Sequence, residues 1–385
     1  MKKIILLFFL ISILISCSIK NESDWTILVY MAADNGLNLD ALADIEDMMQ
    51  AEFSDNINVI VQVDHSSSNN PPAAYRYHIY PELMEQISYL GEIDSGDENE
   101  ITSFANWGFN KYPSEKQALV LWSHGNGWYH NFCKDVESGN YISIADGEIR
   151  RGIKNINEHL EILIFDACNM QTVEVAAEVA DYTKYIIASE DGVNSVGFPY
   201  AEIFTAWEGQ TNTENLCLEI GFQYHQYYDG LVGVDQFSCS VLKTNEFDGM
   251  LTKLEEFTAV YSDSANAEIF VESRQQCLEF NDGGFTNPPL DVDIKEFFTI
   301  VSDNTEDEQL ETMADELLTT IESCYIFQNT DDYPTGYTSD DVGAAIIWFP
   351  DEETQYFFDT RREEYQQLRF TETGWLDFLE NTFTE

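Results

Sequence analysis

Two reactive side chains of this 385-residue chain come directly after apolar runs of strand length. His124 follows the run 119–122 and opens the glycine-containing turn His-Gly-Asn-Gly, and Cys168 follows the run 162–165, two residues after Asp166. A thiol that lies just ahead of a helix and beside an imidazole has a lowered pKa and becomes nucleophilic. Either residue alone is typical of ordinary packing or of a polar loop. The two in this order predict nucleophilic catalysis.

The two runs belong to a regular alternation of predicted strands and helices. Buried strands are predicted over 25–31, 57–63, 117–122, 160–165 and 184–188, helices over 37–49, 101–112, 145–155 and 171–180, and a hairpin over 75–80 and 86–90. Strands separated by single helices predict an α/β fold with a mostly parallel sheet sandwiched by helices. Functional groups of such sheets gather where the strands end. We therefore expect His124 and Cys168 at one edge.

The composition and the predicted secondary structure of the chain change near residue 245. Acidic helical segments are predicted over 246–259, 291–302 and 306–323, followed by an apolar strand over 343–350. That strand either returns to the main sheet or belongs to a separate core. We divide the chain into an export signal (1–17), a tether (18–24), a catalytic domain (25–245) and a smaller helical C-terminal region (246–385).

The charge balance excludes one class of partner. Lys and Arg number 18 and Asp and Glu 70, which gives a net charge of −52, so the chain repels polyanions and nucleic acid is excluded as a ligand. An apolar content of 44% is ample for packed cores and is unlike the composition of disordered chains.

No motif supports a metal or a cofactor. The six histidines form no H-E-x-x-H pair, and the acidic clusters at 94–100, 303–311 and 331–341 lack the glycine and terminal glutamate of a calcium loop. We expect no metal site and no required cofactor, and calcium binding has no motif behind it. Apart from Cys17, six cysteines occur without any C-x-x-C pair, and we expect most to be small buried residues.

The N-terminus reads as an export signal. Lys2 and Lys3 precede an apolar run over 4–15, which ends in Ser16-Cys17. This order resembles the lipobox of bacterial lipoproteins, in which the cysteine is lipidated and becomes the mature N-terminus. We expect Cys17 to anchor the protein in the cell envelope, outside the cytoplasm. A plain secretory signal and an uncleaved anchor are the alternatives.

The motifs together resemble the clostripain-like cysteine peptidases (family C11), whose caspase-like fold places a His-Gly and a Cys on neighbouring strand ends. The likeness extends to an opening strand at 25–35, a nucleophile strand at 163–170, a following strand and substrate loop at 187–200, and the C-terminal segments 342–350 and 370–379. It covers about residues 25 to 380.

The resemblance implies roles for individual residues. By this resemblance, Cys168 is the nucleophile and His124 the base or acid that serves it. On physical grounds we also expect the backbone N–H groups of Gly125 and Cys168 to face the oxyanion of the tetrahedral intermediate. Asp166 matches the acid that binds a basic P1 side chain, with Arg preferred over Lys. Its alternative role is a strand-end Asp that bonds nearby backbone.

Three further segments carry expectations drawn from the family. Phe198 stands in the substrate loop where relatives often have Trp. Asp191 and Glu190 are candidates for a second acid of the pocket, or solvated loop charges. Lys134 is a candidate site of self-cleavage, and the predicted helix makes Arg150 and Arg151 poorer sites.

We therefore expect a cysteine endopeptidase that cleaves peptide or protein substrates after basic residues through an acyl-enzyme, and that contacts the membrane through its N-terminal lipid. Two alternatives remain open. One is a catalytically inactive surface lipoprotein that uses the caspase-like scaffold as a binding module. The other is a cysteine amidase or transpeptidase on the same scaffold. The intact His124 and Cys168 pair favours an enzyme.

Overall fold

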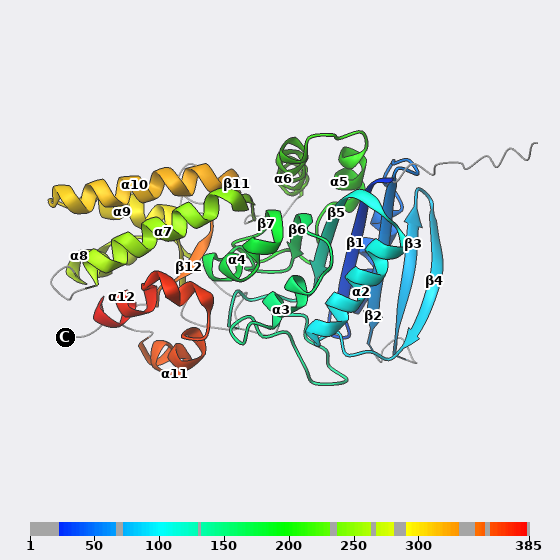
Figure 1. Ribbon diagram of the computed structural model, residues 1–385, viewed down its shortest axis with the longest axis horizontal. Coiled ribbons are helices and arrows are strands. Elements are labelled where there is room, and N and C mark those ends of the chain that lie inside the picture. The colour runs from blue at the N-terminus through cyan, green and yellow to red at the C-terminus, as the bar shows by residue number, and fades with distance from the viewer. Residues whose placement is uncertain are drawn as a thin grey trace, which may run out of the picture.

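The computed structural model describes residues 23–66, 72–129, 132–231, 237–262, 267–280, 290–330, 343–350 and 355–382. A nine-stranded sheet runs through the molecule in the order β11-β8-β7-β6-β5-β1-β2-β3-β4 (Figure 1). Its strands are β1 (Ser23–Ala33), β2 (Ile57–His65), β3 (Ala73–Tyr80), β4 (Leu83–Gly91), β5 (Ser114–Trp122), β6 (Leu160–Asp166), β7 (Thr183–Ala188), β8 (Ser238–Lys243) and β11 (Tyr325–Thr330).

The centre of the sheet is parallel, as the alternation of strands and helices predicts. β2, β1, β5, β6 and β7 pair in parallel, whereas β3, β4, β8 and β11 pair antiparallel at the two sides. β1 is buried over nearly its whole length, which is typical of a strand covered on both faces. The predicted hairpin is confirmed as β3 and β4.

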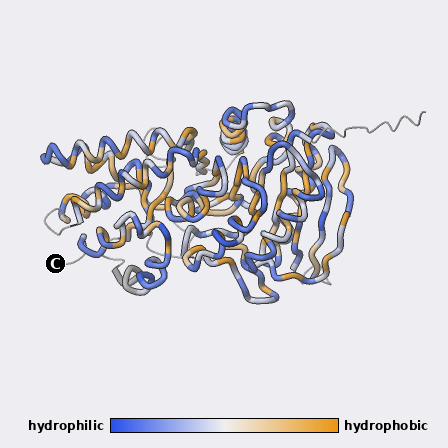
Figure 2. Tube along the Cα trace, viewed as in Figure 1, coloured by the Kyte–Doolittle hydropathy of each residue, from blue (hydrophilic) through white to orange (hydrophobic). Residues whose placement is uncertain are grey.

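Successive side chains of a strand point to opposite faces, so the sheet builds two cores. Leu28 and Tyr30 of β1 face one core, and Ile27 and Val29 face the other. The first core is covered by α2 (Glu98–Lys111), α3 (Glu148–Lys154), α4 (Val173–Val179) and α7 (Thr244–Tyr261), and the second by α1 (Asn38–Met48), α5 (Tyr200–Trp207) and α6 (Thr213–Asp229). Figure 2 shows hydrophobic residues along the strands and hydrophilic ones on the outer helices.

The C-terminal part is mainly helical, as expected. It contains α8 (Ala267–Arg274), α9 (Ile294–Asn304), α10 (Glu308–Cys324), α11 (Gln355–Tyr365) and α12 (Trp375–Thr382), which extend beyond the sheet in Figure 1. Phe257 of α7 packs against Phe270, Phe298 and Phe378, with ring centroids 4.9 to 5.9 Å away. Aromatic packing of this kind joins α7, α8, α9 and α12 into one core.

The apolar strand near residue 346 does not return to the main sheet. β12 (Ile346–Trp348) pairs antiparallel with β10 (Asp291–Asp293), which also pairs with β9 (Glu279–Phe280) in a second, three-stranded sheet. The predicted helix at 291 accordingly begins only at Ile294, because its first residues form β10. Within the described part of the chain, no helix has the length and apolarity needed to cross a bilayer.

Candidate active site

His124 and Cys168 lie at equivalent positions on neighbouring strand ends. β5 and β6 pair in parallel with Trp122 opposite Asp166, and the Ser123 N–H donates to the Asp166 carbonyl at 3.2 Å. His124 and Cys168 each come two residues after this last pair. The parallel register therefore brings the two side chains to the same edge of the sheet, as the sequence predicts.

The turns that follow β5 and β6 pack backbone against backbone. A Cβ placed on Gly125 would lie 2.6 Å from the Cys168 carbonyl oxygen and 2.9 Å from the Ala167 Cβ. Such contacts are sterically forbidden, so only glycine fits at this position. The Gly125 and Cys168 segments thus lie in direct contact, which is the proximity that a shared oxyanion hole requires.

The Cys168 thiol is partly exposed and is held by the loop after β7. Sγ accepts a hydrogen bond from the Val193 N–H at 3.3 Å and lies 3.6 Å from the Val193 carbonyl oxygen. Burial raises the pKa of the thiol, the Val193 N–H lowers it, and the charge of Asp166 raises it. Our expectation of a lowered pKa is therefore wrong for this conformation. The physical reason is that α4 begins only at Val173, so its N-terminus is too far away to favour a thiolate.

His124 is exposed at the start of the turn that follows β5. A Cβ on Gly36, in the loop after β1, would lie 3.9 Å from its Nε2 atom. Partial desolvation lowers the pKa of the imidazole, and Asp40 opposes this effect while Lys134 adds to it. A raised thiol pKa and a lowered imidazole pKa both favour the neutral forms, so the resting state is a thiol and a neutral imidazole.

Asp166 is 3% exposed and bonded to the loop that precedes α5. Its Oδ2 atom accepts hydrogen bonds from the Tyr200 hydroxyl at 2.6 Å and from the Phe198 N–H at 3.3 Å. Burial raises the pKa of Asp166 to about 6, and these two donors lower it. A backbone partner is thus present, as in the alternative role of this residue, but a tyrosine hydroxyl shares the same oxygen.

A second buried acid lies beside Asp166. Asp44 of α1 accepts a hydrogen bond from Trp122 Nε1 at 2.7 Å, and a Cβ on Gly197 would lie 2.6 Å from its Oδ2 atom. Burial, together with the charge of Asp166, raises the pKa of Asp44 to about 9, and the Trp122 donor opposes this effect. The pair of neighbouring acids therefore carries one negative charge more readily than two.

The three remaining pocket candidates lie in different surroundings. Phe198 is 1% exposed and packs on Tyr224 with ring centroids 4.7 Å apart, so only its backbone reaches Asp166. Asp191 is partly buried, and its Oδ1 atom accepts from the Gly192 N–H. Glu190 is fully buried, and burial together with Asp293 raises its pKa well above the ordinary value. The interpretation of Glu190 as a solvated loop charge is wrong, because β8 and the C-terminal region cover it.

The candidate cleavage residues differ in secondary structure, as the sequence predicts. Lys134 is exposed in the loop after β5, and its carbonyl accepts from Asn35 Nδ2 at 3.0 Å. Arg150 and Arg151 lie on α3, where they pair with Glu178 and Glu98.

The lipidation candidate Cys17 and the export signal lie outside the described residues. The remaining cysteines, Cys133, Cys217, Cys239, Cys277 and Cys324, are free and buried, as expected.

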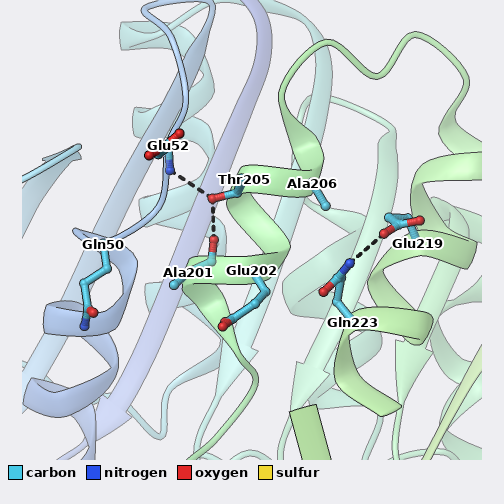
Figure 3. Close-up of a pocket in the computed structure, with 8 residues that line it drawn as sticks. All are labelled: Gln50, Glu52, Ala201, Glu202, Thr205, Ala206, Glu219 and Gln223. Atoms are coloured by element: carbon cyan, nitrogen blue, oxygen red, sulfur yellow. Dashed lines mark hydrogen bonds between the residues drawn. The ribbon is translucent and has the colours of Figure 1, made fainter. Parts of the chain in front are cut away.

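A separate groove of about 450 Å³ lies away from these residues. It is open to solvent between the end of α1, α5 and α6, and it is lined by Gln50, Glu52, Ala201, Glu202, Thr205, Ala206, Glu219 and Gln223 (Figure 3). Its polar groups largely bond one another, as in the bond from Gln223 Nε2 to Glu219 Oε1 at 2.7 Å. Its lining contains neither a cysteine nor a histidine, and its one hydroxyl, that of Thr205, donates to the Ala201 carbonyl, so we assign the chemistry to the strand ends instead.

Sequence reasoning did not single out Val193, Tyr200 and Asp44, which contact Cys168 or surround Asp166. Val193 and Tyr200 lie within the substrate loop predicted at 187–200. No local pattern marks Asp44, because the tertiary fold brings it to the site. Asn169 is different. It adopts a left-handed backbone conformation at φ 56°, and its side chain donates to the Glu190 carbonyl at 2.7 Å. An Asn directly after a strand-end cysteine is a recognisable signal for such a turn.

The fold and the site define a caspase-like α/β protein with a thiol and an imidazole at one sheet edge. Two solved structures share this fold at low identity. An inactive zymogen C11 protease from Parabacteroides distasonis gives a TM-score of 0.72 at 21% identity, over 92% of this chain and 99% of its own. A secreted C11 cysteine protease from Bacteroides thetaiotaomicron, in complex with an irreversible peptide inhibitor, gives 0.68 at 20% identity over the same shares.

The sequence comparisons identify the family. The model of the clostripain family matches residues 29–380, so the chain belongs to this family of C11 cysteine peptidases. Clostripain from Hathewaya histolytica is 27% identical over 236 residues, which are 50% of this chain and 44% of that protein. The match thus spans less than half of that relative's length. The predicted family and the caspase-like fold are confirmed.

Proposed function

We propose that this protein is a cysteine endopeptidase in which Cys168 is the nucleophile and His124 is its acid and base. The observation that carries the proposal is the parallel register of β5 and β6, which sets both residues two positions beyond the pair Trp122 and Asp166. Gly125 supports it, because its contact with the Cys168 carbonyl leaves no room for a side chain between the two turns.

The neutral resting pair determines the order of proton transfers. His124 takes the Sγ proton as the sulfur attacks the scissile carbonyl, so thiolate character develops only with substrate bound. The imidazolium then gives this proton to the leaving amine, and an acyl-enzyme remains. A water molecule, deprotonated by His124, hydrolyses the thioester and restores the thiol.

The oxyanion of each tetrahedral intermediate needs preorganised donors. The backbone N–H groups of Gly125 and Cys168 are our candidates, and one such donor is typically worth roughly 3 to 4 kcal/mol. In the resting conformation, the Val193 N–H donates a hydrogen bond to the Cys168 Sγ atom. A substrate carbonyl that approaches Sγ displaces this hydrogen bond.

We infer that Asp166 selects a basic P1 side chain. Its two hydrogen bonds both fall on Oδ2, which leaves Oδ1 for a substrate cation. The neighbouring Asp44 adds no positive charge, so a guanidinium or ammonium group is the natural counterion of this buried carboxylate. Arg is expected above Lys, because its planar fork offers several donors in fixed directions.

The test is a panel of fluorogenic peptides that vary at P1, assayed with the wild type, Cys168→Ala and His124→Ala. Both variants should fold and lose most of the activity, and the loss of acid and base catalysis alone should lower the rate roughly 10²–10⁴-fold. Cys133→Ala is the matched control, because this cysteine is buried and its raised pKa keeps it protonated. Labelling of Cys133 in place of Cys168 by a thiol-reactive peptide inhibitor would contradict the assignment.

We also propose how the chain matures. Self-cleavage after Lys134 is supported by the exposure of this residue in the loop that follows His124. Lys134→Ala should then leave the chain in one piece, whereas Lys154→Ala on α3 should not.

Cys17 is proposed to carry the lipid that anchors the protein outside the cytoplasm, and Cys17→Ser should release it from the membrane fraction. Unchanged detergent partitioning would count against the anchor.

A further inference from the structure

The second sheet contacts the segment that follows Cys168. β12 lies beside α4, the helix that comes after this cysteine (Figure 1). The Ile346 N–H donates to the Gln171 carbonyl at 3.0 Å, and Ile346 forms an isolated parallel bridge with Thr172. The chain that leads from Cys168 into α4 is therefore hydrogen-bonded to the C-terminal region.

Glu174, in the first turn of α4, is the next point of contact. It is fully buried, and its Oε1 atom accepts hydrogen bonds from the Trp348 N–H at 3.0 Å and from the Tyr365 hydroxyl at 2.9 Å. A buried carboxylate is stable only when donors or counterions compensate for the lost water. These two donors come from β12 and α11, so the C-terminal region helps to fix the start of α4.

The same two residues pack on the turn that follows β5. The ring centroid of Trp128 lies 5.1 Å from that of Trp348 and 4.9 Å from that of Tyr365, and all three side chains are buried. The next residue, Tyr129, donates its hydroxyl proton to Asp291 of β10 at 2.9 Å. Edge-to-face aromatic packing has a preferred geometry, so it fixes the position of Trp128 as well as burying it.

The turn between His124 and Trp128 needs an anchor of this kind. It contains Gly125 and Gly127, and Gly127 adopts a left-handed conformation at φ 60°. Glycine has more backbone freedom than any other residue, so the turn does not hold the imidazole in place by its own conformational preference. Trp128, four residues after His124, is the buried end of the turn.

We propose that Trp348 and Tyr365 are positioning residues of the peptidase. Each of them contacts Trp128, at the end of the histidine turn, and Glu174, in the helix that follows the cysteine. The two turns are thereby held in one fixed relation. The inference rests on the proposed function, in which the histidine and the cysteine form the dyad. It gives the C-terminal region, which supplies neither reacting group, a part in the reaction.

A fixed relation between the turns matters because proton transfer is sensitive to distance. The thiol proton passes to the imidazole only when the two groups are within hydrogen-bond reach, roughly 2.6–3.2 Å between heavy atoms. A displacement of roughly 1 Å that originates outside the reacting groups can lower the rate about 10²-fold. Loss of the anchor should therefore lower kcat and leave KM nearly unchanged, because the anchor does not touch the peptide.

Tyr365 is the residue to change, because its side chain makes both contacts. Tyr365→Phe keeps the ring against Trp128 and removes only the hydroxyl bond to Glu174, whereas Tyr365→Leu removes both. The matched control is Tyr185→Phe near the start of β7, which deletes another hydrogen bond from a tyrosine hydroxyl to a glutamate, at 3.3 Å.

The first readout is the cleavage of the fluorogenic peptide that the wild type hydrolyses fastest. Each rate is divided by the concentration of active sites, which is titrated to completion with an irreversible peptide inhibitor. The kcat should fall roughly threefold in Tyr365→Phe and roughly thirtyfold in Tyr365→Leu, with KM within about twofold of the wild-type value. Tyr185→Phe should keep the wild-type kcat.

Unfolded molecules do not react with the inhibitor, so a merely structural role of Tyr365 would leave the kcat per active site unchanged. That result would overturn the proposal, as would a rise of KM at constant kcat. If Tyr365→Leu does not fold, Tyr365→Phe decides the outcome.

Hydrogen exchange supplies a second readout that needs no peptidase activity. The full chain carrying Cys168→Ala is compared with and without Tyr365→Leu. Amide exchange over residues 124–129 and 169–174 should become roughly tenfold faster, whereas Tyr185→Phe should not change it. Unchanged exchange in both segments would show that the turns do not depend on the C-terminal region, and the proposal would fail. A failure of the proposed function would instead appear as an inactive wild type.

Discussion

Two groups of buried carboxylates lie at the same edge of the sheet, and they differ in what satisfies them. Asp44 and Asp166, beside the thiol, accept hydrogen bonds from Trp122, Tyr200 and the Phe198 backbone. The second group surrounds Asp64, which is buried and meets the negative charges of Asp135, Glu92 and Asp34.

The difference separates two ways of keeping an acid inside a protein. Where the fold supplies the donors, the position of the carboxylate is fixed, and one oxygen can be kept for a substrate. Where the fold supplies mainly further carboxylates, a raised pKa lets the buried acid keep its proton, as the pKa of about 8 of Asp64 indicates. The two groups are thus two solutions to the same problem of desolvated charge.

The largest effect expected from this comparison follows from Asp166→Asn. The kcat/KM for peptides with Arg at P1 should fall roughly 10²–10⁴-fold, because the loss of one partner from a buried charge pair costs about 3–5 kcal/mol. Peptides with a neutral P1 should change little. The assay is run at constant ionic strength with Asp248→Asn as the control. If the Arg preference persists, Asp166 serves only to bond the loop before α5.

A smaller effect is expected from Tyr200→Phe, which deletes the 2.6 Å hydrogen bond to Asp166. Leaving a buried carboxylate short of a donor should lower the free energy of unfolding by about 1–3 kcal/mol. Urea unfolding at neutral pH measures it. Tyr141→Phe, at an exposed position, should change stability by less than about 0.5 kcal/mol. Equal stabilities of the two variants would mean that the fold does not depend on this donor.

The pH dependence should also distinguish the substrates. Asp166 has a pKa of about 6 and gains a proton below it, so the kcat/KM for Arg peptides should fall towards lower pH, by up to about tenfold per pH unit. Desolvation lowers the pKa of His124 from its ordinary value of 6.5, and protonation of this residue reduces the cleavage of both kinds of peptide. A neutral P1 peptide should therefore lack only the additional loss that protonation of Asp166 causes. Superimposable profiles for the two peptides would assign the acid limb to the dyad.

The smallest effect concerns the loop after β5. Asn35→Ala removes the hydrogen bond to the Lys134 carbonyl, together with the bond to the Ala32 carbonyl and the one accepted from the Leu37 N–H. A net loss of about 0.5–1.5 kcal/mol for the loop contact should speed trypsin cleavage after Lys134 roughly two- to tenfold. Asn245→Ala, at an exposed site, is the control. A cleavage rate equal to that of the control would show that the Asn35 side chain does not order the loop.

Much of the architecture could be predicted from local patterns. The continuous apolar run of β1 and the amphipathic helix after it are signals within a dozen residues, and both elements form where expected. Helix α9 begins later than the sequence predicts, because Asp291–Asp293 pairs with β12. That strand is contributed by a segment more than fifty residues away. Pairing between distant segments has no local signature, so it overrides a helical pattern without warning.

The sequence by itself determined that a histidine and a cysteine end two buried strands, because strand length, parallel pairing and chain order leave them no other edge. Only the tertiary structure decided their protonation. The raised pKa of Cys168 and the lowered pKa of His124 depend on desolvation by segments that converge from elsewhere in the chain. The same holds for Asp34 and Asp64, whose pKa values burial raises. Charge and burial act through space, and distance in space is what the order of residues alone does not specify.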